Sequence, residues 1–314
     1  MLDEGAHSSF DKVLSLLKGN PPEQRFDIHL SYPEYLKVEE TWSKIKADAN
    51  ISEDRRYPRL SYNSHAETVT VVTIPRSLHE VAAFELRHQT MTGIEAYLIS
   101  HRPEASGEII EVGSTTIKMS DGNYAHSVKD ADGLFVYSGR GVRDTDTVVF
   151  EVGFSENYAA LCWDKDMWIQ GDHVNACVLI CLKESPRFRN PPERYENLQD
   201  LAEYVDAAVD QDALYYGQIR YKDHIWVGGL REAFIEVWRI DSHVRDPLIR
   251  DLRPCETLPS TIGFHVSDFY SNNAWEALGI PDYITPFNGP MYLRRLMSAM
   301  VFMAGRRFSD FIAQ

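Results

Sequence analysis

The spacing of apolar positions divides the chain into a helical beginning, a strand-rich centre and a mixed C-terminal part. Apolar residues at positions 10, 13, 14, 16 and 17 recur with helical spacing and stop at the sequence Gly19-Asn20-Pro21-Pro22. Residues 35–51 predict a second helix with a charged outer face. Residues 60–74 are rich in β-branched side chains around a turn-like Asn63-Ser64-His65, so they predict a hairpin.

The centre of the chain alternates between strand-like and helix-like patterns. A helix is predicted from residue 77 to about residue 91, ending before Gly93, and a second helix over 155–170. The expected strands are 96–100, 109–112, 115–119, 133–137, 147–153 and the fully apolar 174–183. This order predicts an α/β (α+β) domain in which helices flank a central mixed sheet.

The C-terminal part continues with a different mixture of elements. An acidic amphipathic helix is predicted over 195–214, strands over 225–241 and 262–269, and a closing helix over 291–311. We expect residues 1–56 to form an N-terminal helical segment packed on a core of residues 57–183. Residues 184–314 are then a C-terminal β/α extension that completes the same domain.

Composition limits the classes of function. Among 314 residues, 32 Lys and Arg face 47 Asp and Glu, a net charge of −15, which argues against a protein coated in basic surface for sequence-blind nucleic-acid binding. The helix 195–214 has six acids and no Lys or Arg. It is a solvated face, a mimic of a nucleic-acid backbone or a docking surface for a basic protein partner. No apolar run approaches the ~18 residues of a membrane span, and no secretory signal is visible. We therefore expect an intracellular protein, in the cytoplasm or the nucleus, with no membrane contact.

Two carboxylates stand out because they lie on neighbouring predicted strands. Asp132 opens the strand 133–137, and Glu151 lies inside the β-branched strand 147–153. A buried acid in such a strand is costly without a partner. If the two strands pair as a hairpin, the carboxylates meet near one end of the sheet and form an oxygen-rich site suited to Mg²⁺ or Mn²⁺. Such an ion can polarise a phosphodiester and lower the pKa of an attacking water.

Two short motifs extend this pattern, Lys129-Asp130-Ala131-Asp132 and Val149-Phe150-Glu151-Val152-Gly153, with Asp164 and Lys165 on the following helix. Together they resemble the PD-(D/E)xK nuclease superfamily over residues 57–183, most closely its divergent members dispersed in fungal genomes and a related bacterial branch. The resemblance implies a restriction-endonuclease-like core and a Mg-dependent endonuclease acting on DNA. It assigns Asp132 and Glu151 as metal-binding acids and Glu80 as an additional acid at the metal site.

The sequence also departs from the pattern of this superfamily. Ala131 stands where proline is usual, and Gly153 stands where the superfamily's lysine is expected. Lys165 is the candidate replacement, to stabilise charge on the phosphate or to orient the water. The last predicted helix carries four arginines that are candidate phosphate contacts: Arg294, Arg295, Arg306 and Arg307. The alternative is that this helix is an ordinary packed amphipathic helix at the end of the chain.

Each candidate has an ordinary structural interpretation, and the function has an alternative. Asp132 can be a turn acid before glycine, Glu80 a capping-box partner of Ser77, and Lys165 a solvated helix residue. Glu151 can be an ordinary solvent-facing residue only if its strand lies at the edge of the sheet.

The alternative function is a catalytically inactive nuclease-like protein that binds nucleic acid or protein, which Gly153 and the net charge favour. An unrelated α/β enzyme also remains open. Acids that converge while Lys165 points away would favour the inactive form.

Overall fold

A computed structural model describes residues 8–19, 25–49, 58–72, 77–139, 144–154, 157–191, 216–221 and 224–312. The chain divides into two compact units that are both discontinuous in sequence. Unit 1 comprises residues 1–75, 114–131 and 166–173, and unit 2 comprises residues 76–113, 132–165 and 174–314. The boundaries expected at residues 56 and 183 therefore do not coincide with this division.

Unit 1 is a small sheet with two helices of its own. Its strand order is β1-β3-β2-β6-β5. The elements are α1 (Ser9–Lys18), β1 (Arg25–His29), α2 (Tyr32–Asp48), β2 (Arg59–Asn63), β3 (Thr68–Val72), β5 (Thr116–Lys118) and β6 (Val128–Asp130). Both predicted helices and the predicted hairpin β2–β3 are present, and the hairpin is joined by β1, which the pattern did not predict. Their apolar faces bury one core that includes Val13, Val38 and Val69.

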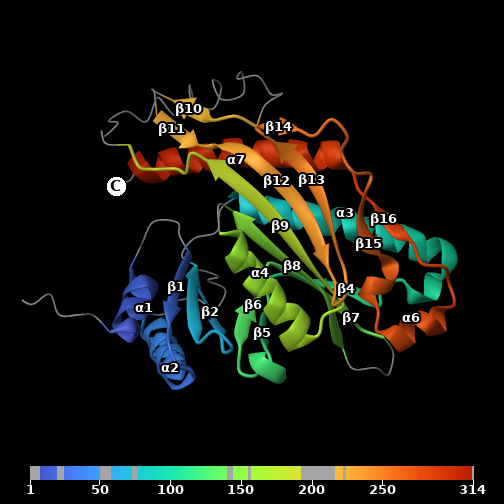
Figure 1. The fold of residues 1–314 in the computed structure, drawn as a ribbon, viewed down its shortest axis with the longest axis horizontal. Helices are drawn as coiled ribbons and strands as arrows, with labels where there is room; N and C mark the ends of the chain where they lie inside the picture. Colours follow the sequence, from blue (N-terminus) through green and yellow to red (C-terminus); the bar gives the residue numbers. More distant parts are fainter. Residues whose placement is uncertain are drawn as a thin grey trace, which may run out of the picture. The chain divides into compact units, whose positions relative to one another are not determined.

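Unit 2 is built on a seven-stranded mixed sheet of order β14-β13-β12-β9-β8-β7-β4 (Figure 1). Its strands are β4 (Ile109–Val112), β7 (Gly133–Tyr137), β8 (Thr145–Phe154), β9 (Ala176–Ser185), β12 (Gly229–Trp238), β13 (His243–Arg250) and β14 (Arg253–Pro254). Strands β8 and β9 are parallel, and the other neighbours are antiparallel. Because β12 pairs with β9, the strands after residue 184 belong to the same sheet as the central ones.

Helices cover both faces of this sheet (Figure 1). One face packs against α3 (Ser77–His101) and α7 (Gly289–Ile312), and its core includes Phe150, Ile180 and Ile235. The opposite face carries α4 (Tyr158–Met167), whose Leu161 side chain lies against Gly153 of β8. Successive strand residues point to opposite faces, so Phe150 and Val152 face α3 and α7, whereas Glu151 and Gly153 face α4.

The remaining described elements of unit 2 are short. They are η1 (Pro103–Ala105), β10 (Ile219–Tyr221), β11 (His224–Val227), β15 (Thr261–His265), η4 (Val266–Phe269), α6 (Asn272–Leu278) and β16 (Ile284–Pro286). In unit 1, η2 (Gly122–Tyr124) and the π-helical turn η3 (Trp168–Asp172) complete the set. None of the helices in these described ranges is both long and apolar enough to cross a bilayer.

Three sequence predictions about elements of unit 2 were wrong. The strand expected over 262–269 ends at His265, and residues 266–269 form η4. The expected strand 96–100 is the last part of α3, which continues past Gly93 to His101. A Cβ on Gly93 would lie 3.0 Å from Pro286 Cδ, so this glycine allows β16 to approach the helix and does not end it. The expected strand 225–241 is divided at Gly228, whose amide donates to Glu184 Oε1 instead of joining a strand ladder. The predicted acidic helix 195–214 lies outside the described residues.

Candidate carboxylate site

The structure places Asp132 against β8 at the level of Glu151. Strands β7 and β8 pair with Gly133 opposite Phe150. The amide of Asp132 donates to the carbonyl of Phe150, and Asp132 Oδ2 accepts a 2.9 Å hydrogen bond from the amide of Val152. These two backbone partners are the residues on either side of Glu151. The hairpin that the sequence predicted therefore forms, and it brings the two acid-bearing backbone positions together.

His79, in the first turn of α3, lies between Asp132 and Glu80. Its Nε2 is 3.1 Å from Asp132 Oδ2, and its Nδ1 is 3.6 Å from Glu80 Oε1. Burial acts to lower the pKa of His79, but the Asp132 carboxylate, assisted by Glu80, outweighs it and raises the pKa to about 10. His79 is thus a cation at neutral pH. Its sequence context gives no sign of this role beyond its place directly before the candidate Glu80.

Glu151 is buried, with 4% of its surface exposed, in the middle of the sheet. It pairs with Leu179 of β9, and strand alternation directs its side chain to the α4 face. The carboxylate of Asp132, by contrast, contacts the first turn of α3. The two acids leave adjacent backbone positions and have different helix neighbours. Glu151 lies in an interior strand, so the solvent-facing interpretation does not apply to it.

Lys165 and Gly153 have apolar or aromatic neighbours on the α4 side of the sheet. The Lys165 ammonium lies 4.2 Å from the centre of the Trp238 ring on β12, and two strand steps separate β12 from β8 in the sheet. A Cβ on Gly153 would be only 2.9 Å from Leu161 Cδ2. The space that a lysine at position 153 would need is therefore occupied by an apolar side chain of α4.

The four arginines of α7 have different surroundings. Arg307 is buried, donates to Glu184 Oε1 at 2.8 Å and to the Trp226 carbonyl, and is not an exposed phosphate contact in this structure. Arg306 is exposed and lies 3.9 Å from Asp310 on its own helix. Arg295 lies 3.7 Å from Glu85 of α3, and Arg294 is exposed. Arg295, Arg306 and Arg307 thus have acidic neighbours other than Asp132.

A second buried acid, Glu236, was missed in the sequence. It is fully buried on β12, and its carboxylate accepts from the Tyr158 hydroxyl at 2.7 Å and from Trp238 Nε1 at 3.0 Å. Arg245 Nε donates to its other oxygen at 2.5 Å. Glu236 lies in the run Phe234-Ile235-Glu236-Val237-Trp238, so the argument that singled out Glu151, an acid inside an apolar strand, would also have found it.

Register places both buried acids at one level of the sheet. Leu179 of β9 is the pairing partner of Glu151 on one side and of Glu236 on the other. Both acids therefore lie on the α4 face, separated by one strand. Burial and the hydrogen bond to Glu236 raise the pKa of Tyr158, so its hydroxyl remains a donor.

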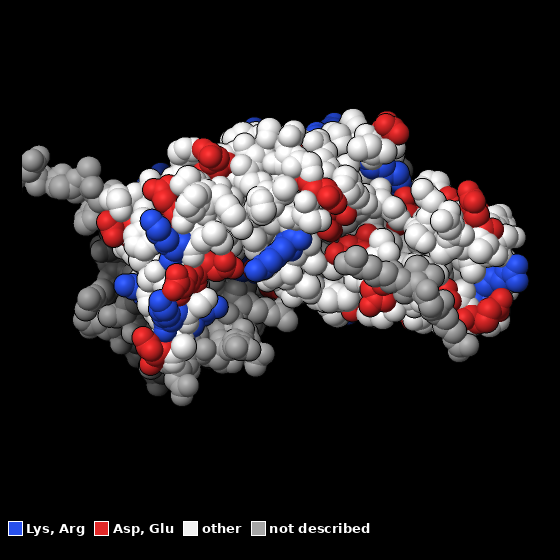
Figure 2. Space-filling view, turned by 90° about the horizontal axis from the view of Figure 1, so that it is seen from below, with Lys and Arg blue, Asp and Glu red and all other residues white. Residues whose placement is uncertain are grey.

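Neither the surface charge nor comparison with known proteins assigns a function to this site. On the face drawn in Figure 2, basic and acidic side chains are interspersed, and no large surface of a single charge is visible. Within the described ranges, no group of three or more His, Cys, Asp or Glu residues is placed to hold a metal ion. No family model, no curated protein and no solved structure matches the chain.

Proposed function

We propose that the protein hydrolyses phosphodiester bonds of DNA with a divalent ion held by Asp132 and Glu151. One observation carries the proposal: the Asp132 carboxylate accepts the hydrogen bond of the Val152 amide, which places it beside the strand position of Glu151. The order of elements around them, a helix, three antiparallel strands, a helix and a parallel strand, also supports it.

The donor chemistry of the two acids suits Mg²⁺, which commonly uses one or two carboxylates and completes its coordination with water and phosphate oxygens. Such an ion, when bound, would polarise the phosphodiester and lower the pKa of an attacking water. His79 already places a positive charge beside Asp132, with Glu80 on its other side. It therefore orients the Asp132 carboxylate and also competes with an ion for it.

A second candidate is a nuclease-like protein that binds its partner without cleaving it. Two observations favour it: Leu161 fills the space beside Gly153, and the Lys165 ammonium stacks on Trp238. A lysine at position 153 would stabilise charge on the reacting phosphate, and the glycine at that position cannot.

Cleavage of plasmid and single-stranded DNA in Mg²⁺ or Mn²⁺ separates the two candidates. The hydrolase requires cleavage by the wild type that EDTA and Glu151→Gln each abolish. The matched control is Glu184→Gln, which replaces another buried glutamate of the same sheet, one that is hydrogen-bonded to Arg307. If wild type and Glu151→Gln cleave equally, or neither cleaves, the hydrolase proposal is wrong.

Metal binding gives an independent test of the ligands. Calorimetric titration with Mg²⁺ should show weaker binding to Asp132→Asn and tighter binding to His79→Gln, because the latter removes the competing charge from the carboxylate. An unchanged Mg²⁺ affinity in both variants would show that Asp132 is not a ligand.

A further inference from the structure

The α4 side of strands β9, β12 and β13 carries a row of cations beside an aromatic platform. We define the cation-ring strip as Lys165, Lys183, Trp238, His243, Arg245 and Arg250. Its members come from α4, β9, β12 and β13, all within unit 2. Trp238 and the position of Glu232, which pairs with Lys183 and Arg250, are six steps apart on β12, so the strip is about 20 Å long at the rise of an extended strand.

The aromatic end of the strip is a stacked pair. Trp238 and His243 are partners in the β12–β13 ladder, and their ring centres lie 4.1 Å apart with planes only 8° from parallel. Lys165 stands over Trp238, and the His243 side chain is exposed. Trp238 Nε1 is held by the buried Glu236, so the platform is oriented before any ligand arrives.

The same buried carboxylate orients the central cation. Arg245 donates to Glu236 and lies 4.3 Å from the centre of the Phe234 ring, yet its side chain is 46% exposed. Glu236 itself is inaccessible, so it orients the guanidinium without presenting negative charge at the surface. One acid thus positions both a ring and an arginine that face outward.

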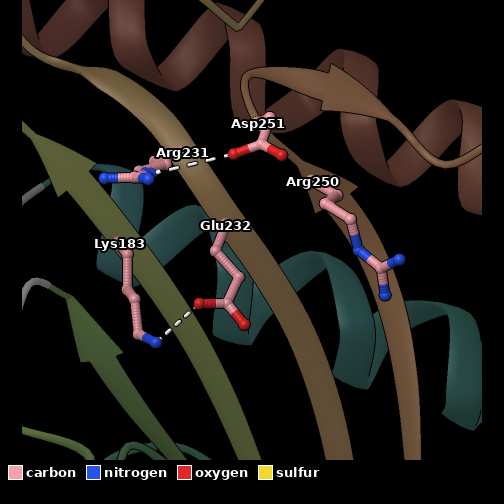
Figure 3. Close-up of a pocket in the computed structure, with 5 residues that line it drawn as sticks. All are labelled: Lys183, Arg231, Glu232, Arg250 and Asp251. Atoms are coloured by element: carbon pink, nitrogen blue, oxygen red, sulfur yellow. Dashed lines mark hydrogen bonds and ion pairs between the residues drawn. The ribbon is translucent and has the colours of Figure 1, made fainter.

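The far end of the strip lines a shallow pocket of about 380 Å³ (Figure 3). Lys183 and Glu232 point toward one another there, as do Arg231 and Asp251. Arg250 points away from both pairs (Figure 3). The two ion pairs cancel, so Arg250 supplies the excess positive charge of this pocket.

We infer that the cation-ring strip binds single-stranded nucleic acid. Cations spaced along a strand suit a phosphate backbone, and an exposed histidine ring held on an oriented tryptophan suits an unstacked base. A duplex cannot present a base face to such a platform, and an acidic peptide would leave the platform unused. The binding needs neither metal nor cleavage, although it would place a substrate if the proposed hydrolysis is correct.

Fluorescence anisotropy in EDTA tests the inference, with a labelled oligonucleotide of about 12 nucleotides, within the range that single-strand sites cover. We expect His243→Ala to weaken binding about tenfold, the loss that one stacked base corresponds to. Arg250→Gln should weaken it several-fold and reduce the salt dependence of log Kd by about 0.7. Both side chains are exposed, so thermal melts should match the wild type.

A matched pair of lysines supplies the control. Lys183 and Lys44 each form one surface ion pair, at 2.6 Å with Glu232 and at 2.7 Å with Glu40, and only Lys183 belongs to the strip. Lys183→Gln should weaken binding, whereas Lys44→Gln should not. Equal weakening by both would indicate only a general charge effect and would overturn the inference.

Three further results would also overturn it: equal affinity for the matching duplex, unchanged affinity in His243→Ala, or equal competition by polyglutamate. The last would assign the strip to an acidic protein partner. Failure of the hydrolase proposal has a different outcome, because the oligonucleotide then binds in EDTA but is never cleaved in Mg²⁺.

Discussion

The two faces of the seven-stranded sheet are built from the same strands but have different contents. The middle of the face under α3 and α7 is a hydrocarbon core in which Phe150, Ile180 and Ile235 are fully buried. This face also buries the charged pair Glu184–Arg307, at the end of β9. The face under α4 buries Glu151 and Glu236 instead. Because alternate residues of a strand point to opposite faces, one side can supply stability while the other holds charged groups. The chemistry proposed for this protein therefore concentrates on the α4 side and at the end of β7.

The largest expected effect comes from the apolar face. Phe150→Ala should lower the free energy of unfolding by about 4 kcal/mol, because it leaves a cavity in a closed core. Phe150 contacts the rings of Phe135 and Phe264, with ring centres 5.6 and 5.9 Å away. Urea denaturation measures the loss. Oligonucleotide binding by the folded variant should be unchanged, and weakened binding would mean that the two faces are not separable.

Removal of Glu236 should have the largest effect on the α4 face. Glu236→Ala leaves the Tyr158 hydroxyl and Trp238 Nε1 without their acceptor, at a cost of about 3 kcal/mol in unfolding free energy. Arg245 is half exposed and can turn to water. The control Glu232→Ala removes an exposed ion pair to Lys183 and should cost less than about 1 kcal/mol. Equal losses in urea titrations would contradict a structural role for Glu236.

The pair His79–Asp132 should give a smaller effect that depends on pH. The pKa of His79 in the folded protein, about 10, lies above its ordinary value. Its stabilisation is therefore complete below about pH 6.5 and is lost as the pH rises toward 10. His79→Gln should cost about 1.5 kcal/mol at pH 6, and the difference from wild type should shrink toward pH 10.

Urea titrations at a series of pH values measure this difference. His88→Gln is the matched control, because His88 lies on the same helix and stacks on Phe84 without a carboxylate partner among the described residues. A constant difference between wild type and His79→Gln across the range would show that the histidine stabilises by packing alone.

The smallest effect should come from the contact between Gly153 and Leu161. Gly153→Ala places a Cβ 2.9 Å from Leu161 Cδ2, and such overpacking should cost about 1 kcal/mol. Leu161→Ala removes the clash, so the double variant should be more stable than the sum of the two single changes implies. Strict additivity in thermal melts would show that the two positions do not touch.

Several features of the fold could be predicted from local pattern. The strand 133–137 was predicted with the observed bounds of β7, and the strands 147–153 and 174–183 were predicted to within a few residues of β8 and β9. The central mixed sheet flanked by helices was also confirmed. The prediction of a strand over 96–100 was wrong because Gly93 was interpreted as the end of the preceding helix. Gly93 instead lies inside the helix and leaves room for β16, which is nearly 200 residues later in the chain.

The candidate site was predictable in its acids and not in their partners. The pairing of β7 with β8 follows from two adjacent strand patterns, and it was enough to bring Asp132 next to the position of Glu151. The partner of Lys165, the Trp238 ring, lies on a strand that begins more than 60 residues later in the chain. No local period contains that information, because side-chain partners depend on which distant elements become neighbours.

The sequence by itself determined the alternation along each strand, and with it the face to which Glu151 and Gly153 point. That alternation is a property of the extended backbone and needs no tertiary contact. Only the tertiary structure decided that His79 forms an ion pair with Asp132 and that Leu161 fills the space beside Gly153. It also decided that Glu236 orients Trp238 and Arg245. The first contact joins segments more than 50 residues apart, and the others depend on how a helix or a strand packs on its neighbour. Burial stabilises the charged pairs only in this arrangement, because a buried charge is stable only with its partner.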